Sequence, residues 1–327
     1  MESFKKKDQN KESKVNDLIF KELIKRGYSL EGNTRVWNIA DSKLWYLTPE
    51  QAQSYLDVED SKSYQKLASG SEFELIEAHI KDIKNSLQVD NLNIVDLGCG
   101  DGQKAAHIIK KINGFYKKIK YFPIDISGYM VSKAVKTVSN IPGVDEVVET
   151  QWNISDFDNL QNITTLLNSE EHSRNLFLLL GGTLGNFEIH DLLYQIKASM
   201  RIEDLLMIVT GIGHDKWELW TKDQENNKKL DAFFRYTPLL LGLEDKDLKF
   251  GARLTNGRIE YYYTILDDKL ISFQNKEVKF YQGDQIVVAV SYKHKKEDLL
   301  SYLNMHFKEA EIFLSKDKAM VLALCKK

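Results

Sequence analysis

A glycine-rich turn between two apolar segments is the feature that most constrains how this chain can fold. Asn91-Leu-Asn-Ile-Val-Asp-Leu97 predicts a buried strand, and 103–112 predicts a helix rich in alanine and isoleucine. Between them lies Gly98-Cys-Gly100-Asp-Gly102. Glycines let the backbone approach a ligand closely, and a following helix presents free N–H groups. The turn therefore predicts a ligand-binding loop at the end of the strand.

The spacing of these glycines separates two kinds of cofactor site. It is G-x-G-x-G here, whereas a dinucleotide-binding turn has G-x-G-x-x-G. With Asp96 opening it, the turn resembles the first motif of class I S-adenosylmethionine (SAM)-dependent methyltransferases. The resemblance implies SAM as the cofactor, with Gly98, Gly100 and Gly102 at its site. From the residues alone, a plain glycine loop stays the alternative.

Further apolar runs follow at helix-sized intervals, at 120–125, 146–152, 175–180 and 205–210. Strands that alternate with helical patterns predict a parallel sheet with both faces buried. A helix is expected before the sheet at 72–87, and a strand pair at 311–314 and 319–324 is expected to complete it.

The pattern changes after Gly213, where the alternating segments 258–265, 270–273 and 285–292 predict an antiparallel layer. Asn256-Gly257 predicts a tight hairpin, because both residues tolerate positive φ. We therefore expect an α/β fold, a Rossmann-like class I methyltransferase sheet with an inserted α+β substrate-binding domain. The methyltransferase domain is placed at 68–213 and 294–327, and the substrate-binding domain at 1–67 and 214–293.

Two acidic positions lie where a SAM site needs hydrogen-bond acceptors. Asp125 ends the second strand and can accept from both ribose hydroxyls, since a carboxylate is purely an acceptor and can be bidentate. Asp156 and Phe157 follow the third strand, where Asp156 can bind the adenine amino group and Phe157 can pack beside the ring. A helix N-cap is the alternative for Asp125, and a structural role stays open for Asp156.

A second glycine-rich loop, Gly181-Gly-Thr-Leu-Gly-Asn186-Phe187, closes the fourth strand. Together with Gly98-Cys-Gly-Asp-Gly-Gln-Lys104, it resembles the histidine N-alpha-methyltransferases of ergothioneine biosynthesis, which pair a G-x-G-x-x-x-K motif with a G-G-T-[IL]-G-N-F loop. The resemblance extends, more faintly, over nearly the whole chain.

This resemblance assigns roles to individual residues. It implies that Gly98, Lys104, Asp125, Asp156 and Phe157 contact SAM, that Asn186 holds the amino-acid end of the substrate, and that Tyr46 and Tyr64 reach the cofactor and the substrate. From the residues alone, a solvated lysine of the first helical turn is the alternative for Lys104. The two tyrosines are equally read as packing at a domain seam.

The chain departs from the family pattern near the end of the insertion. Where the family has Glu-Val-Ser-x-Lys, with Glu and Ser binding the substrate imidazole, this chain has Ala289-Val-Ser291-Tyr-Lys293. Ser291 remains at the substrate, but Ala289 cannot replace the lost carboxylate, which disfavours histidine as the substrate. Tyr261 and Tyr263 are expected to line the pocket and to suit an indole or another apolar amine, although tyrosines in a strand are often simply core.

Charge and composition limit the partners. The chain has 45 Lys+Arg against 48 Asp+Glu, a net charge of −3, which argues against nucleic-acid and membrane-surface binding. Without an apolar run long enough for a membrane span, and with only Cys99 and Cys325, a cytoplasmic protein is expected. The seven histidines have no metal-ligand spacing, so no metal is expected. The lysine cluster 293–296 is interpreted as a solvated face.

These observations predict a SAM-dependent N-methyltransferase that acts on the amino group of a small amino acid or amino-acid derivative. No catalytic residue is assigned, since catalysis by alignment is sufficient when the leaving group is a neutral thioether. Asn186, Tyr64 and Trp217 or Trp220 would orient the substrate. A methyltransferase for a protein side chain and a non-catalytic SAM-binding module are the alternatives. The sequence fixes no oligomeric state, and a monomer is favoured.

Overall fold

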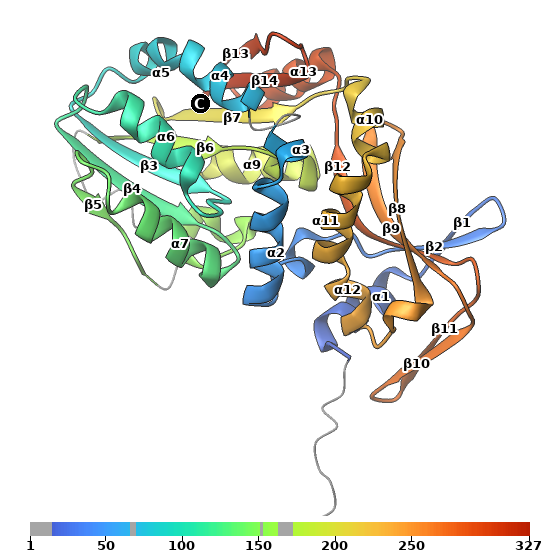
Figure 1. Cartoon of the computed structure of the whole chain (residues 1–327). Helices are drawn as coiled ribbons and strands as arrows, with labels where there is room; N and C mark the ends of the chain where they lie inside the picture. The colour runs from blue at the N-terminus through green and yellow to red at the C-terminus, as the bar shows by residue number, and fades with distance from the viewer. Residues whose placement is uncertain (1–14, 66–69, 151–152, 163–172) are drawn as a thin grey trace, which may run out of the picture.

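The computed structural model describes residues 15–65, 70–150, 153–162 and 173–327. They form two large sheets that lie side by side and a separate two-stranded hairpin (Figure 1). The chain begins in the layer around the smaller sheet, builds most of the larger sheet, returns to the smaller one and ends in the larger one. No helix in the described ranges is long and apolar enough to cross a membrane.

The larger sheet has seven strands in the order β13-β14-β7-β6-β3-β4-β5. Their bounds are β3 (Asn91–Leu97), β4 (Lys118–Ile124), β5 (Glu146–Val147), β6 (Ser173–Leu179), β7 (Leu205–Gly211), β13 (Glu309–Leu314) and β14 (Met320–Lys326). Strands β3 to β7 are parallel, and β14 runs antiparallel to β7 and to β13. The order reverses between β3 and β6, the place where open α/β sheets bind ligands. The expected Rossmann-like α/β fold is confirmed.

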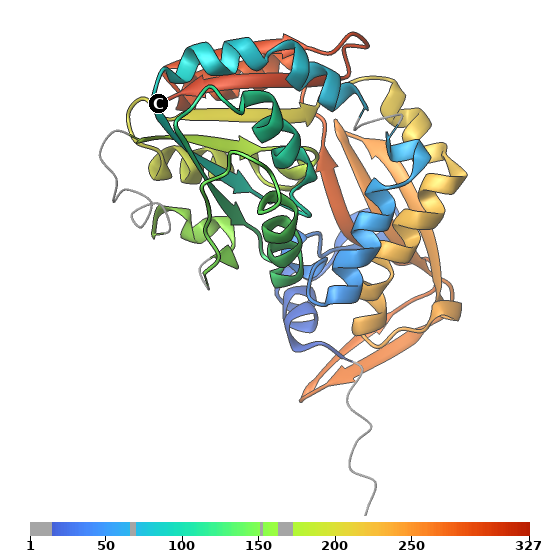
Figure 2. The same cartoon turned by 60° about the vertical axis from the view of Figure 1, so that its left-hand side comes forward.

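Helices cover both faces of this sheet, as Figure 2 shows from the side. One face carries α4 (Gly70–Ala78), α5 (Ile80–Leu87), α6 (Gln103–Ile112) and α7 (Gly128–Val138), and the other carries α9 (Ile189–Ser199) and α13 (Lys296–His306). Alternate strand residues serve the two faces: Ile94 packs with the first set and Val95 with the second. Because helices cover both faces, β3 is buried from Leu92 to Leu97.

The smaller sheet has the order β1-β2-β12-β9-β8. Its strands are β1 (Ser29–Glu31), β2 (Thr34–Asn38), β8 (Leu248–Thr255), β9 (Arg258–Ile265) and β12 (Gln285–Tyr292), and β10 (Lys269–Phe273) pairs separately with β11 (Lys276–Phe280). The predicted hairpin between β8 and β9 is confirmed, with φ of 48° at Asn256 and 71° at Gly257. Nearby lie α1 (Asp17–Arg26), α2 (Pro49–Glu59), α3 (Lys62–Tyr64), α10 (Lys216–Lys222), α11 (Gln224–Phe234) and α12 (Tyr236–Leu240) (Figure 1).

Several elements differ from the sequence prediction. The helix expected at 72–87 is two helices that break at His79, whose ring stacks on Phe313 with centroids 3.9 Å apart. The third strand covers only 146–147 of the expected 146–152, and residues 151–152 lie outside the described ranges. The proposed domain boundary at 67/68 also lies outside them. Strands β1, β2 and β11 and helix α2 were not predicted.

The segment 214–293 leaves the larger sheet and returns to it at one place. The Gly213 N–H donates to the His294 carbonyl at 2.9 Å, and the adjacent Ile212 N–H donates to the Ala319 carbonyl at 3.0 Å. Strand β12, the last of this segment, therefore brings its end directly to the carboxyl end of β7 (Figure 1).

Candidate functional site

Three neighbouring cavities lie around the carboxyl ends of β3 and β6. The glycine-loop cavity is lined by Tyr46, Gly98, Gly100, Asp125, Asp156 and Phe157, among others. The aromatic cavity is lined by Tyr64, Trp217, Trp220, Tyr261, Ala289 and Ser291, among others. The acidic cavity is lined by Glu59, Asp96, Asp101 and Lys104, among others, and shares Gly98 and Gly100 with the first. Asn186 and Tyr55 line both the glycine-loop and the aromatic cavity.

The first glycine loop has the conformation that only glycine adopts readily. Gly98 and Gly100 have φ of 69° and 52°, and a Cβ on Gly100 would meet no atom within 4 Å. Its backbone is therefore open to a ligand. Gly102, which was placed at the cofactor, lines none of the three cavities. A Cβ there would lie 2.8 Å from the Cα of Ala134, so this glycine permits close packing of α6 on α7.

Asp125 is held at the cavity by backbone N–H groups. One carboxylate oxygen accepts from the Ser127 N–H at 2.9 Å and the other from the Gly100 N–H at 3.2 Å. Burial raises the pKa of Asp125 to about 6, against the effect of these N–H donors. The N-cap of α7 is Ser127, so the alternative role of Asp125 as a helix cap does not apply.

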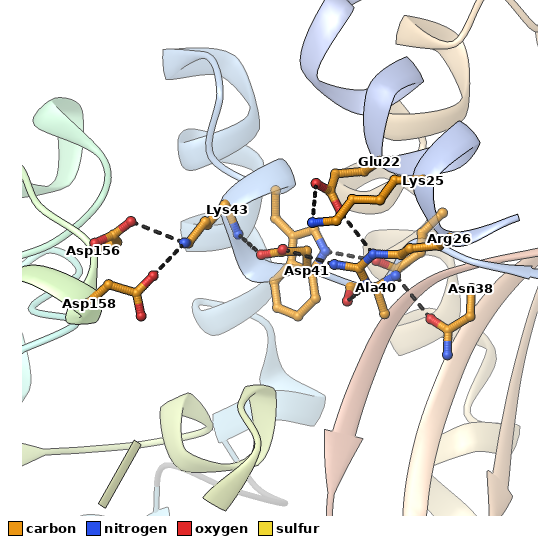
Figure 3. Close-up of polar contacts among 11 residues, drawn as sticks. Glu22, Lys25, Arg26, Asn38, Ala40, Asp41, Lys43, Asp156 and Asp158 are labelled. Atoms are coloured by element: carbon orange, nitrogen blue, oxygen red, sulfur yellow. Dashed lines mark hydrogen bonds and ion pairs between the residues drawn. The ribbon is translucent and has the colours of Figure 1, made fainter. Parts of the chain in front are cut away.

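A chain of polar contacts ties the N-terminal segment to the loop after β5 (Figure 3). The Lys43 ammonium lies 3.1 Å from Asp156 and 3.2 Å from Asp158. The Lys43 N–H donates to Asp41 at 3.0 Å, and the other oxygen of Asp41 accepts from Arg26 at 3.1 Å. Because Lys43 and Asp156 both line the glycine-loop cavity, these contacts close one of its walls.

Aromatic rings form another wall of the glycine-loop cavity. Phe157 packs against Phe187 with ring centroids 5.1 Å apart, and both line the cavity. The Tyr46 ring lies edge-on to Tyr55 at 5.6 Å. Burial, aided by the negative charge of Asp125, raises the pKa of Tyr46 well above its ordinary value, so its hydroxyl stays protonated. Tyr46 thus brings a neutral hydroxyl close to the carboxylate of Asp125.

Lys104 links the two glycine loops. Its ammonium lies 3.0 Å from Glu59 and 3.5 Å from Glu72, and Glu72 also accepts a hydrogen bond from the Gly181 N–H at 2.8 Å. Burial raises the pKa of Glu72, and Lys104 opposes this rise. The reading of Lys104 as a solvated lysine is therefore wrong. Its two acidic partners come from α2 and α4, and sequence spacing gave no sign of them.

Asp96, at the start of the glycine motif, is a buried acid in the acidic cavity. Its carboxyl group accepts a hydrogen bond from the Tyr121 hydroxyl at 2.6 Å. Burial raises the pKa of Asp96 to about 7, although the Tyr121 hydrogen bond acts in the opposite direction. The lining of this cavity has four acidic residues, Glu59, Asp60, Asp96 and Asp101, against one basic residue, Lys104, and this excess suits a cationic group of a ligand.

Aromatic side chains form a large part of the wall of the aromatic cavity. The Trp220 indole N–H donates to the Tyr261 hydroxyl at 2.8 Å, Phe234 stacks on Tyr261 at 5.0 Å and Tyr64 lies edge-on to Trp220 at 5.7 Å. Tyr263 was expected to line the same cavity but does not. Its side chain is fully buried, and its hydroxyl donates a hydrogen bond to Asp231 at 2.9 Å. The cavity is thus a largely apolar space with few polar groups.

Strand β12 and the residue that follows it supply two of these polar groups, Ser291 and Lys293. Ala289, Ser291 and Lys293 alternate along the chain and all line the aromatic cavity. The Lys293 ammonium donates to Ser291 Oγ at 2.8 Å and lies 4.7 Å from the ring centroid of Trp217. Since only 8% of Lys293 is exposed, its assignment to a solvated face is wrong. The two-residue period from Ser291 is the signal that would have found it.

Tyr55 was missed as well, although a local signal was present. Thr48 and Gln51 form a capping box with a proline between them, which marks the start of α2. Recognising that helix would have brought Tyr55 and Glu59, one turn apart, to the same face. Tyr55 lines all three cavities, so it lies at their centre.

One of three comparisons with known proteins identifies a family for this chain. The model of a family described as histidine-specific, SAM-dependent methyltransferases matches residues 64–327. A search of curated protein sequences finds no match. Among solved structures, a SAM-dependent methyltransferase from Clostridium acetobutylicum is similar at 13% identity and TM-score 0.44, covering 84% of this chain and 98% of its own. A protein from Pyrococcus horikoshii is similar at 12% identity and TM-score 0.43, covering 83% and 97%. Since the family match spans well over half of its length, the chain belongs to the histidine-specific, SAM-dependent methyltransferase family.

Proposed function

We propose that this methyltransferase acts on the amino group of a small amino acid or amino-acid derivative other than histidine. The observation that carries the proposal is the position of Asn186, which lines both the glycine-loop cavity and the aromatic cavity. An asparagine amide can accept from an amine and donate to a carboxylate at once. An amino acid held by Asn186 would therefore present its nitrogen towards the cofactor.

The residues around the first glycine loop fit SAM. The open backbone at Gly100 and the acceptor oxygens of Asp125 suit the ribose, and Phe157 beside Asp156 suits the adenine. Bound SAM supplies a sulfonium methyl group, which the amine lone pair takes as the S–C bond breaks and its electron pair returns to a neutral thioether. We assign Lys104 and Tyr46 to the same cofactor site.

The chain's own residues would align the amine and exclude water. Tyr64 and Asn186 line the aromatic cavity, and Trp217 and Trp220 add apolar ring surface to its wall. An apolar wall favours the neutral amine, whose proton passes to water before the site closes. Alignment of the lone pair with the methyl carbon is the main contribution of such a site. This chemistry needs no catalytic acid, since the leaving group is neutral.

Ala289 is the reason for excluding histidine. It contributes one methyl group to the cavity, next to Tyr261 across the β9–β12 pair. An imidazole bound there would leave an N–H group without an acceptor, which lowers affinity. We also propose that 68–213 and 294–327 bind SAM and that 1–67 and 214–293 bind the substrate. The aromatic cavity supports this division, since α2, α10, α11, β9 and β12 supply most of its walls.

A thermal-shift screen with S-adenosylhomocysteine and a panel of amino acids tests the proposal. The product of the cofactor should raise the melting temperature, and an accepted amino acid should raise it further. Asn186→Ala should abolish methyl transfer but leave cofactor binding close to normal, whereas Asn140→Ala, at an exposed asparagine, should leave both unchanged. Turnover that persists in Asn186→Ala would refute the role of Asn186. A response to the cofactor without any response to amines would favour a protein substrate.

A further inference from the structure

We propose that Lys293 and Ser291 form a carboxylate-binding subsite in the aromatic cavity, so that the methyl acceptors are amines that also carry a carboxylate. The inference rests on the proposed function, which it narrows by naming the chemical group that the cavity recognises.

Lys293 is a buried cation that lacks a counter-charge. Its side chain is 8% exposed, and none of the ion pairs among the described residues includes it. Its contacts are the Ser291 hydroxyl and the face of the Trp217 ring. Burial, together with the nearby ammonium of Lys216, lowers the pKa of Lys293 to about 8. A buried charge without a partner is unfavourable, so an anion bound beside it gains affinity.

The other charged residues near Lys293 are paired with other partners. Glu72 is the carboxylate among the described residues that line this cavity, and it is bound to Lys104 and to the Gly181 N–H. Lys216 is itself a cation, and its partner Asp317 lies 2.9 Å from it, so that carboxylate is paired with Lys216. Ala289, on the same face of β12, brings only a methyl group. The charge of Lys293 is thus left for a ligand.

The hydrogen-bonding groups at this point are donors. Ser291 Oγ accepts from Lys293, which leaves the Ser291 hydroxyl proton free to donate. The Lys293 ammonium has two further N–H groups. Adjacent donors with a positive charge match the two oxygens of a carboxylate and repel the N–H edge of a neutral imidazole. The same chemistry serves an α-carboxylate or a side-chain carboxylate.

The direct test uses a carboxylate that has no amine, so that its outcome does not depend on turnover. Quenching of tryptophan fluorescence reports the binding of 3-phenylpropionate and of its uncharged amide, with S-adenosylhomocysteine present. We expect the acid to bind at least tenfold more tightly than the amide to the wild-type protein. In Lys293→Met the two should bind alike, in Lys293→Arg part of the preference should return, and the exposed-site control Lys295→Met should match the wild type.

Turnover assays then identify which carboxylate is recognised. If it is the α-carboxylate, converting phenylalanine to its α-amide should raise KM at least tenfold in the wild type and have little effect in Lys293→Met. If it is a side-chain carboxylate, Lys293→Met should raise the KM for glutamate at least tenfold and should leave the KM for phenylalanine unchanged. An acid-over-amide preference that survives in Lys293→Met would overturn the subsite, whether or not amino acids are methylated. A preference that depends on Lys293, without methylation of any amino acid, would keep the subsite and refute the proposed function.

Discussion

Replacing Lys293 by methionine should make the protein more stable while it weakens ligand binding. Methionine has a similar length and no charge, so it can fill the same space beside Trp217. The fold lowers the pKa of Lys293 from 10.5 to about 8, and each pKa unit corresponds to about 1.4 kcal/mol, so the burial of this charge costs about 3 kcal/mol. The lost hydrogen bond to Ser291 offsets a part of the gain.

The pH dependence gives the sign of the effect. Between pH 8 and 10.5 the unfolded chain still holds the Lys293 proton while the folded protein releases it, so the free energy of unfolding of the wild type rises with pH. Lys293→Met lacks this rise. The free energy of unfolding of Lys293→Met should exceed that of the wild type most at pH 7, and this difference should shrink by about 3 kcal/mol as the pH approaches 10.5.

Urea denaturation of both proteins at several pH values between 7 and 10 measures this difference. At about 2 cal/mol/K of unfolding entropy per residue, 3 kcal/mol corresponds to about 4 °C in melting temperature for a chain of this length. Lys295→Met, at an exposed lysine two positions along, should follow the wild type throughout. A stability difference that stays constant from pH 7 to 10 would show that Lys293 titrates as an ordinary lysine and would refute the reasoning.

Two further predictions concern the cofactor side of the site. Affinity for SAM should fall about tenfold between pH 7 and pH 5, since protonation of Asp125 near pH 6 removes acceptors for the ribose hydroxyls. Calorimetric titration measures this affinity, and Asp125→Asn should bind SAM weakly at both pH values. An affinity of the wild type that does not change with pH would exclude Asp125 as the ribose acceptor. Lys104→Met should lower the free energy of unfolding by about 3 kcal/mol, because Glu59 and the buried Glu72 lose their cation. Chemical denaturation should show partial recovery in Lys104→Met/Glu72→Gln, and a single variant as stable as the wild type would contradict the argument.

The parts of the fold that the sequence predicts well depend on short-range signals. The strand at 91–97 and the helix at 103–112 agree with β3 and α6, because a short segment with four large apolar residues, followed by three glycines, leaves few other conformations. The β8–β9 hairpin follows from Asn256 and Gly257, both of which have positive φ. In contrast, β2 joins the smaller sheet through Val36 beside Gln285 of β12, a pairing that no local pattern indicates.

The residues of the candidate site also differ in whether a local sequence signal predicts their position. The position of Asp125 and Asn186 at the glycine-loop cavity could be predicted, because each follows a strand of a parallel sheet, where ligand-binding residues gather. Lys293 was misread because three of the four residues at 293–296 are lysines, which is typical of a solvated face. Its burial follows from the position of β12 against the end of β7, which becomes apparent only once segment 214–293 is folded.

The position of β14 between β7 and β13 has a consequence for synthesis on the ribosome. About 110 residues separate the end of β7 at Gly211 from the start of β14 at Met320. At about 5 to 20 residues per second, the edge of β7 waits roughly 5 to 20 s for its antiparallel partner. During that time a nascent chain presents an unpaired apolar strand edge, the structure most open to intermolecular pairing. Early closure of segment 214–293 would shield the carboxyl end of β7 while the last two strands are still being made.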